Sequence, residues 1–179
     1  MKLKKKCAMN LNSYIFPYLF NLIYYQSSSV EITLPEVPAS VGGTGRILSI
    51  DRDLTLRDAI EKVKLHAGIK SVNVAIGNNQ NIDSSLIKTV GICAGSGASV
   101  FKGVKADLYL TGEMSHHEVL DAQERNTSVI LCNHSNSERG YLKEFKEIFH
   151  KQVPENEVKV IVSEVDSDPL ESKTSFRTE

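Results

Sequence analysis

The sequence contains no tryptophan, three cysteines and no long uninterrupted apolar run. The cysteines, Cys7, Cys93 and Cys132, form no Cys-x-x-Cys pair, which argues against a structural zinc knuckle. Their odd number, with two of them in apolar strand-like segments, favours buried, reduced thiols over a disulfide framework. We therefore expect a cytoplasmic protein, with the nucleus or a mitochondrion as alternatives.

Excess charge of either sign is also missing, since 21 basic and 22 acidic residues leave a formal net charge of -1. No broad basic face is expected, so we predict no direct binding to nucleic acid. The apolar segments are far shorter than the ~20 residues of a membrane span, so we predict no membrane partner. A length of 179 residues, with 41% hydrophobic and 24% charged residues, is typical of one globular domain.

Residues 1–45 differ from the rest of the chain. Lysines at four of the first six positions precede an apolar segment at residues 11–25, which mimics a secretory signal. Asparagines and Pro17 interrupt that segment, and residues 26–45 are rich in Ser, Pro and Gly, as linkers are. We predict a poorly ordered leader and linker over 1–45, a domain over 46–170 and a tail over 171–179. A targeting signal is the alternative for the leader.

Strand-like and helix-like segments alternate through the domain. Short apolar or alternating runs predict strands at 46–50, 71–76, 90–93, 106–110, 128–132 and 158–162. Helical spacing and caps predict helices from Thr55 to Gly68 and at 98–103, 115–123 and 137–150. Such alternation predicts an α/β fold, a mostly parallel sheet with alternating helices and right-handed connections.

Two polar clusters follow neighbouring predicted strands. The segment Thr111–His117 contains Glu113, His116 and His117, and the segment Cys132–Gly140 contains His134 and Glu138. Open α/β sheets bind ligands at the carboxyl ends of their strands. Imidazoles and carboxylates suit zinc, manganese or iron, so this edge of the sheet is a candidate site for a divalent metal.

Each cluster also has a structural interpretation. His134 and Glu138 are four residues apart and would share one side of a helix, but Ser135 and Glu138 also match a capping box. Ser115 and Glu118 match a second capping box. His116 or His117 could serve as a general acid or base, because an unperturbed imidazole titrates near neutral pH.

Gly95, Ser96 and Gly97 follow the predicted strand at 90–93. The position invites interpretation as a phosphate-binding loop, but a third glycine and a Lys-Ser/Thr pair are both missing. A tight turn between strand and helix is the simpler interpretation.

Three segments resemble one known family. They are Val90–Ser99, Ala106–His117 and Val129–Gly140, and they look like motifs of the Nif-three-like family (Ngg-one-interacting factor three). That family is also catalogued as GTP cyclohydrolase I type two homologues. The resemblance covers roughly residues 45–170 and implies an α/β fold in ring-shaped assemblies of dimers, hence a homo-oligomer.

The resemblance further implies a two-metal site, with His134 and Glu138 matching the family's late ligands. The other family ligands, a His-His-Pro-Leu pair and an Asp, belong to an N-terminal half with no counterpart here. His116 and His117 precede Glu-Val-Leu and match a later motif instead. The chain therefore resembles the C-terminal half alone, as in a truncated form. Because stable sites use about four ligands, we expect it to bind metal weakly or not at all.

Two functions follow as hypotheses. The first is a metal-dependent hydrolase of a small, nucleotide-like substrate. His134 and Glu138 would hold metal, Glu113, His116 or His117 would orient water or move protons, and the backbone of Gly95, Ser96 and Gly97 would approach the substrate. The alternative is a non-catalytic regulatory or scaffold protein with partners in transcription.

Overall fold

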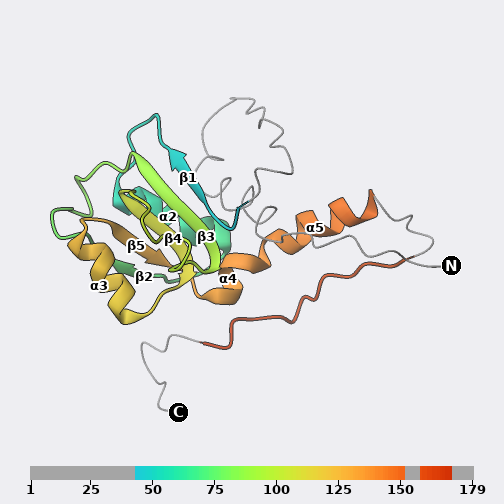
Figure 1. Cartoon of the computed structure of the whole chain (residues 1–179). Coiled ribbons are helices and arrows are strands. Elements are labelled where there is room, and N and C mark those ends of the chain that lie inside the picture. The colour runs from blue at the N-terminus through green and yellow to red at the C-terminus, as the bar shows by residue number, and fades with distance from the viewer. Residues whose placement is uncertain (1–42, 152–157, 171–179) are drawn as a thin grey trace, which may run out of the picture.

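The computed structural model describes residues 43–151 and 158–170 (Figure 1). The predicted leader and linker therefore lie almost entirely outside the described residues, and the predicted tail at 171–179 lies wholly outside them.

A five-stranded sheet forms the centre of the described structure, in the order β1-β3-β4-β5-β2. Strands β3, β4 and β5 run parallel, while β1 and β2 pair antiparallel at the two edges. The α/β prediction is confirmed, and the sheet is mixed because only its three central strands run parallel. The strand bounds are β1 (Arg46–Ser49), β2 (Asn73–Ala75), β3 (Thr89–Ser96), β4 (Leu108–Glu113) and β5 (Ser128–Leu131).

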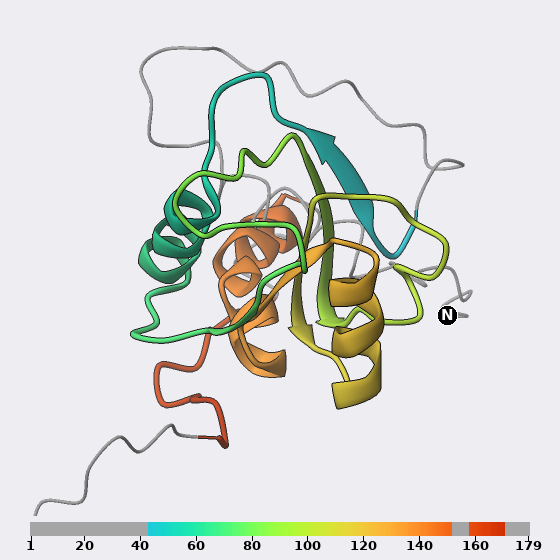
Figure 2. The same ribbon diagram turned by 90° about the vertical axis from the view of Figure 1, so that its left-hand side faces the viewer.

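Helices cover both faces of the sheet, with α2 and α5 on one side and α3 on the other (Figure 2). Their bounds are α2 (Leu56–Ala67), α3 (His116–Glu124), α4 (His134–Arg139) and α5 (Tyr141–His150). Helix α2 begins at a capping box of Thr55 and Asp58 and ends at Gly68, whose φ of 65° is easily adopted by glycine.

The core follows the alternation of side chains along β3. Val90, Ile92 and Ala94 face the larger apolar cluster, which includes residues of α2 and α5. Cys93 faces the opposite side with the Phe101 and Tyr109 rings, which stack at a centroid distance of 4.4 Å. Burial of both faces explains why the central strands have nearly continuous apolar sequences.

Three predicted elements differ from the structure. Residues 98–103 form successive turns rather than a helix, and Gly103 has a φ of 78°. The helix predicted at 137–150 is divided at Gly140, and its first part, α4, starts earlier at His134. A glycine weakens a helix at that point, which allows α4 and α5 to separate.

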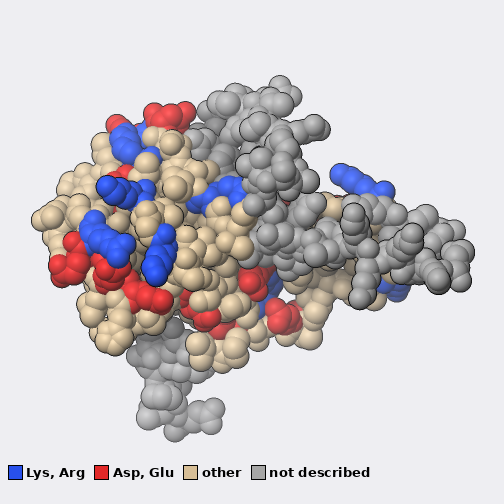
Figure 3. All heavy atoms as spheres, viewed as in Figure 1, with Lys and Arg blue, Asp and Glu red and all other residues tan. Residues whose placement is uncertain are grey.

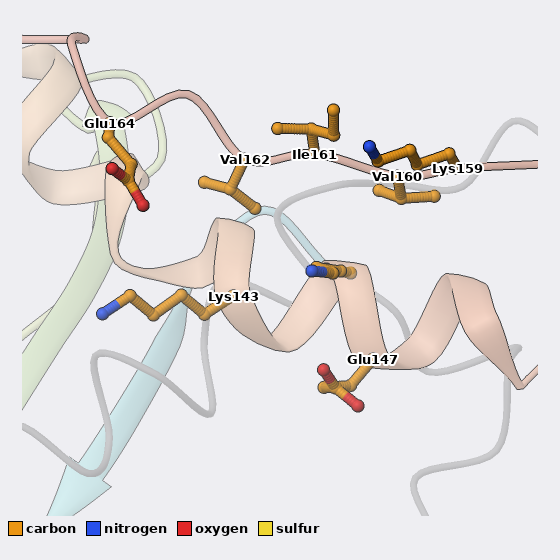
Figure 4. Close-up of a pocket in the computed structure, with 8 residues that line it drawn as sticks. Lys143, Glu147, Lys159, Val160, Ile161, Val162 and Glu164 are labelled. Atoms are coloured by element: carbon orange, nitrogen blue, oxygen red, sulfur yellow. The ribbon is translucent and has the colours of Figure 1, made fainter. Parts of the chain in front are cut away.

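The strand predicted at 158–162 is also wrong. Within the described residues this segment pairs with no strand and instead runs beside α5, where the two enclose a groove of about 450 Å³ (Figure 4). Its branched apolar residues suit a strand, but edge strand β1 and edge strand β2 are both formed by other residues.

The surface carries both signs of charge. Figure 3 shows basic and acidic side chains interspersed on the face that it displays, in keeping with the net charge of -1. None of the helices within the described ranges has the length and apolar character needed to cross a membrane.

Candidate metal centre

The parallel strands bring the two predicted polar clusters together at one edge of the sheet. Strand β4 ends at Glu113, and β5 leads into α4, whose first residue is His134. The Oε1 atom of Glu113 lies 2.8 Å from Nδ1 of His134. Residues 21 positions apart in sequence are thus in hydrogen-bond contact, because neighbouring parallel strands end side by side.

Glu138 reaches the other nitrogen of the same imidazole. One turn of α4 places Glu138 Oε1 3.4 Å from His134 Nε2. The capping alternative for Glu138 does not apply, because the residue at the N-cap of α4 is Asn133 and makes no side-chain cap bond. Glu138 is therefore available for a ligand, with 39% of its side chain exposed beside 48% for His134.

The second capping alternative is confirmed. Ser115 Oγ accepts a hydrogen bond from the backbone N–H of Glu118, and the Glu118 carboxylate accepts one from the N–H of Ser115. Hydrogen bonds from the Ser115 side chain and from its backbone N–H to the carboxyl hold the pKa of Glu118 below its usual value. Glu118 is thus a structural residue at the start of α3.

Gly95 packs closely against the imidazole of His134 and the carboxylate of Glu138. It has a φ of 67°, and a Cβ added there would lie 2.7 Å from Glu138 Oε1 and 3.1 Å from His134 Nε2. Its N–H donates to Ser137 Oγ at 2.8 Å, and that hydroxyl donates to the carbonyl of His134 at 2.7 Å. Glycine is required here both by backbone conformation and by close approach.

The rest of the predicted phosphate-loop segment has a different environment. Gly95 and Ser96 are the last residues of β3, with Ser96 exposed, and Gly97 packs against Thr111 and Phe101. The segment therefore forms a tight turn at the end of β3.

Asn133 holds the entry to α4 in an unusual conformation. Its φ of 69° and ψ of 155° lie in a region that costs a non-glycine residue about 1–3 kcal/mol. Its side-chain amide donates to Asp168 Oδ1 at 3.4 Å. Asn133, Ser137 and Asp168 are not among the site residues predicted from the sequence. For Asn133 the sequence signal is the tolerance of asparagine for a positive φ, and no sequence signal marks Ser137 or Asp168.

The C-terminal described segment closes over this edge of the sheet. Asp166 pairs with Nε of Arg139 at 2.6 Å, and Asp168 accepts from the N–H of Leu170. Together with Glu113 and His134 the segment encloses a pocket of about 270 Å³.

Neighbouring groups set the charge states at the site. The hydrogen bond from His134 to the Glu113 carboxylate raises the pKa of His134, and desolvation opposes this increase. The charges of Glu138, Glu113 and Asp168 add to it. Burial raises the pKa of Cys132 to about 12 and also raises that of Cys93. Both thiols are therefore protonated at neutral pH in the metal-free chain.

His116 and His117 contact each other at the start of α3. Both are exposed at the start of α3, and their rings meet each other edge-on at 5.7 Å. Among the described residues no recorded hydrogen bond, ion pair or ring contact links either ring to Glu113, His134 or Glu138. The structure thus brings together one imidazole and two carboxylates, fewer groups than the two polar clusters contain.

The donor set fits part of a metal site. Donors bound about 2.1 Å from a tetrahedral zinc ion lie about 3.4 Å apart, which agrees with the distance of 3.4 Å between His134 Nε2 and Glu138 Oε1. In residues 43–151 and 158–170 no group of three His, Cys, Asp or Glu side chains is arranged to hold an ion. The spacing of His134 and Glu138 would therefore fit one edge of a coordination polyhedron.

The described residues form a layered α/β fold with an imidazole and carboxylates at the carboxyl ends of its parallel strands, the place where open α/β proteins bind ligands. Comparison with known families is more specific. Residues 3–169 match the family Duf34/NIF3 (NGG1p interacting factor 3), and the chain belongs to that family.

Curated relatives agree with this membership. The chain is 43% identical over 150 residues to NIF3-like protein 1 of Bos taurus, covering 84% of this chain and 39% of the relative. It is 51% identical over 137 residues to NIF3-like protein 1 of Drosophila melanogaster, covering 76% and 45%. It is 42% identical over 131 residues to NGG1-interacting factor 3 of Saccharomyces cerevisiae, covering 72% and 44%. The chain thus spans less than half the length of these relatives.

Solved structures share the fold. The crystal structure of Staphylococcus aureus protein SA1388 superposes with a TM-score of 0.57 at 25% identity, covering 72% of this chain and 37% of that one. A Bacillus cereus protein related to NIF3 superposes with a TM-score of 0.58 at 24% identity, covering 73% and 36%.

Proposed function

We propose that this chain contributes part of a divalent-metal site to a metal-dependent hydrolase of a small, nucleotide-like substrate. The observation that carries the proposal is the pairing of His134 Nε2 with Glu138 Oε1 at 3.4 Å, a spacing suited to two donors on one ion. Zinc, manganese or iron suits this donor pair. Family resemblance adds a second metal and a homo-oligomeric assembly to the proposal.

In this proposal a bound divalent ion would supply Lewis acidity and lower the pKa of a water molecule. His134 and Glu138 would hold the ion, and the backbone at Gly95 would limit the space on its other side. Ser96 and Gly97 would border the substrate, and His116 or His117 would move protons to or from it.

Residues 43–151 and 158–170 offer two such donors, His134 and Glu138, whereas a stable site uses about four. We therefore expect zinc to bind with a dissociation constant of about 1 μM or weaker, less favourably than about -8 kcal/mol. Tight retention of one equivalent of metal through dialysis, measured by elemental analysis, would contradict this expectation.

Isothermal titration calorimetry with zinc and with manganese tests the proposal on the full chain. Binding heat should disappear in H134A and in E138A and should persist in E124A, a matched control because Glu124 is exposed at the end of α3. Equal binding by wild type and H134A would refute the proposed site.

A second candidate is a non-catalytic regulatory or scaffold protein. It is favoured by the name of the yeast relative, NGG1-interacting factor 3, which describes a protein partner of that relative. Surface plasmon resonance with purified yeast NGG1 protein tests it. Binding that survives H134A and E138A, together with no metal-dependent hydrolysis, would favour this function over the first.

A further inference from the structure

Glu113 is placed where it selects which nitrogen of His134 carries the proton. Its Oε1 lies 2.8 Å from Nδ1, on the side of the ring away from Nε2. A neutral imidazole has one N–H donor and one bare acceptor nitrogen. Both ring nitrogens of His134 lie near a carboxylate, but Glu113 is 2.8 Å from Nδ1 whereas Glu138 is 3.4 Å from Nε2. Since the stronger hydrogen bond is the shorter one, the proton of the neutral ring is held on Nδ1 and Nε2 is left bare.

The bare nitrogen faces the groups that a bound ion would contact. Glu138 Oε1 lies 3.4 Å from Nε2, and a Cβ at Gly95 would lie 3.1 Å from the same atom. Because the two ring nitrogens point in divergent directions, Glu113 cannot share an ion bound to Nε2 in this arrangement. It is therefore suited to orient the ring and not to contact the ion.

Both partners are held by the fold. Glu113 is the last residue of β4, a parallel strand between two others, and His134 begins α4 directly after Asn133. The carbonyl of His134 accepts the Ser137 hydroxyl, which fixes the backbone below the ring. Glu113 therefore offers Nδ1–H an acceptor whose backbone is fixed at the end of β4.

We propose that Glu113 is a positioning residue that locks His134 in the Nδ1–H tautomer and so presents Nε2 to a divalent cation. The proposal deepens the proposed metal site and relies on it for the identity of the ligand. Metal-bound histidines commonly donate their second N–H to a carboxylate, and loss of that partner typically weakens metal affinity about 10–100-fold.

The first experiment determines the tautomer of the His134 ring directly. Two-bond 1H–15N spectra of the 15N-labelled full chain, without metal and at a pH where His134 is neutral, distinguish a protonated from a bare ring nitrogen. The His134 signals are assigned by their loss in H134A. We expect bare Nε2 in the wild type, a shift towards Nε2–H in E113A, and retention of Nδ1–H in E113Q, whose amide oxygen still accepts. E124A is the control and should match the wild type.

Zinc titration of the same proteins is the second measurement. We expect E113A to bind zinc about 10–100-fold more weakly than the wild type, with E113Q in between. If E113A does not fold, Glu113→Asp takes its place, because its shorter side chain draws the acceptor away from Nδ1.

The outcomes separate the two proposals. An Nε2–H tautomer in the wild type, or an unchanged tautomer in E113A, overturns the role of Glu113 even if zinc binds. Absence of zinc binding to the wild type overturns the metal proposal, while the tautomer result still decides the role of Glu113.

Discussion

Replacement of Gly95 by alanine should damage the candidate metal centre as well as the stability of the fold. The added Cβ would lie 2.7 Å from Glu138 Oε1, closer than real Cβ atoms come to other atoms, and 3.1 Å from His134 Nε2, which is a tight contact. The carboxylate must move away, and its spacing from the imidazole nitrogen is lost.

The size of the effect has two parts. Alanine at a φ of 67° costs about 1–2 kcal/mol, because the left-handed conformation crowds its Cβ. Displacement of Glu138 leaves one donor of the pair, which we expect to weaken zinc binding at least about 10-fold, or by about 1.4 kcal/mol.

Gly103 provides the matched control. Its φ is 78°, but an added Cβ there meets no atom within 4 Å. G103A therefore has the same conformational cost as G95A but introduces no steric clash. Urea denaturation of both variants measures the shared loss of stability, and zinc calorimetry measures the difference between them. If G95A binds zinc as well as G103A does, the close packing of Gly95 against the pair has no bearing on the ligand site.

Further predictions concern the framework of the site. S137A should destabilise the chain by about 1–3 kcal/mol in urea denaturation, because a buried backbone N–H of β3 loses its acceptor. L110A, at a fully buried position of β4, should cost about 2–5 kcal/mol, whereas L120A, 45% exposed, should cost less than about 0.5 kcal/mol; equal losses would contradict the assigned core. Hydrogen bonds from the hydroxyl and backbone N–H of Thr55 lower the pKa of Asp58. The advantage of wild type over D58A, about 0.5–1 kcal/mol, should therefore be complete above the unfolded-state pKa near about 3.9 and disappear as pH falls through the lower folded-state pKa. A difference that does not change between pH 7 and pH 2 would contradict this role.

Much of the fold was predictable because its signals are local. The capping box at Ser115 and the apolar run at 128–132 correspond to α3 and β5 within one or two residues. The meeting of Glu113 with His134 was also predictable, because it follows from the carboxyl ends of adjacent parallel strands lying at one edge.

The remainder depends on contacts between distant residues. The 158–162 segment has the composition of a strand, but composition does not reveal that both sheet edges are formed by β1 and β2. Which groups His116 and His117 contact likewise depends on where α3 begins relative to the end of β4, which the sequence leaves open.

A zinc titration that follows the NMR signals of each histidine ring tests most directly whether the strand ends form part of a metal site. In 15N spectra of the full chain we expect added zinc to shift Nε2 of His134, with loss of the effect in E138A and little change at His116 and His117. Zinc that shifts the rings of His116 and His117 and leaves His134 unaffected would contradict the assignment of the site to His134 and Glu138.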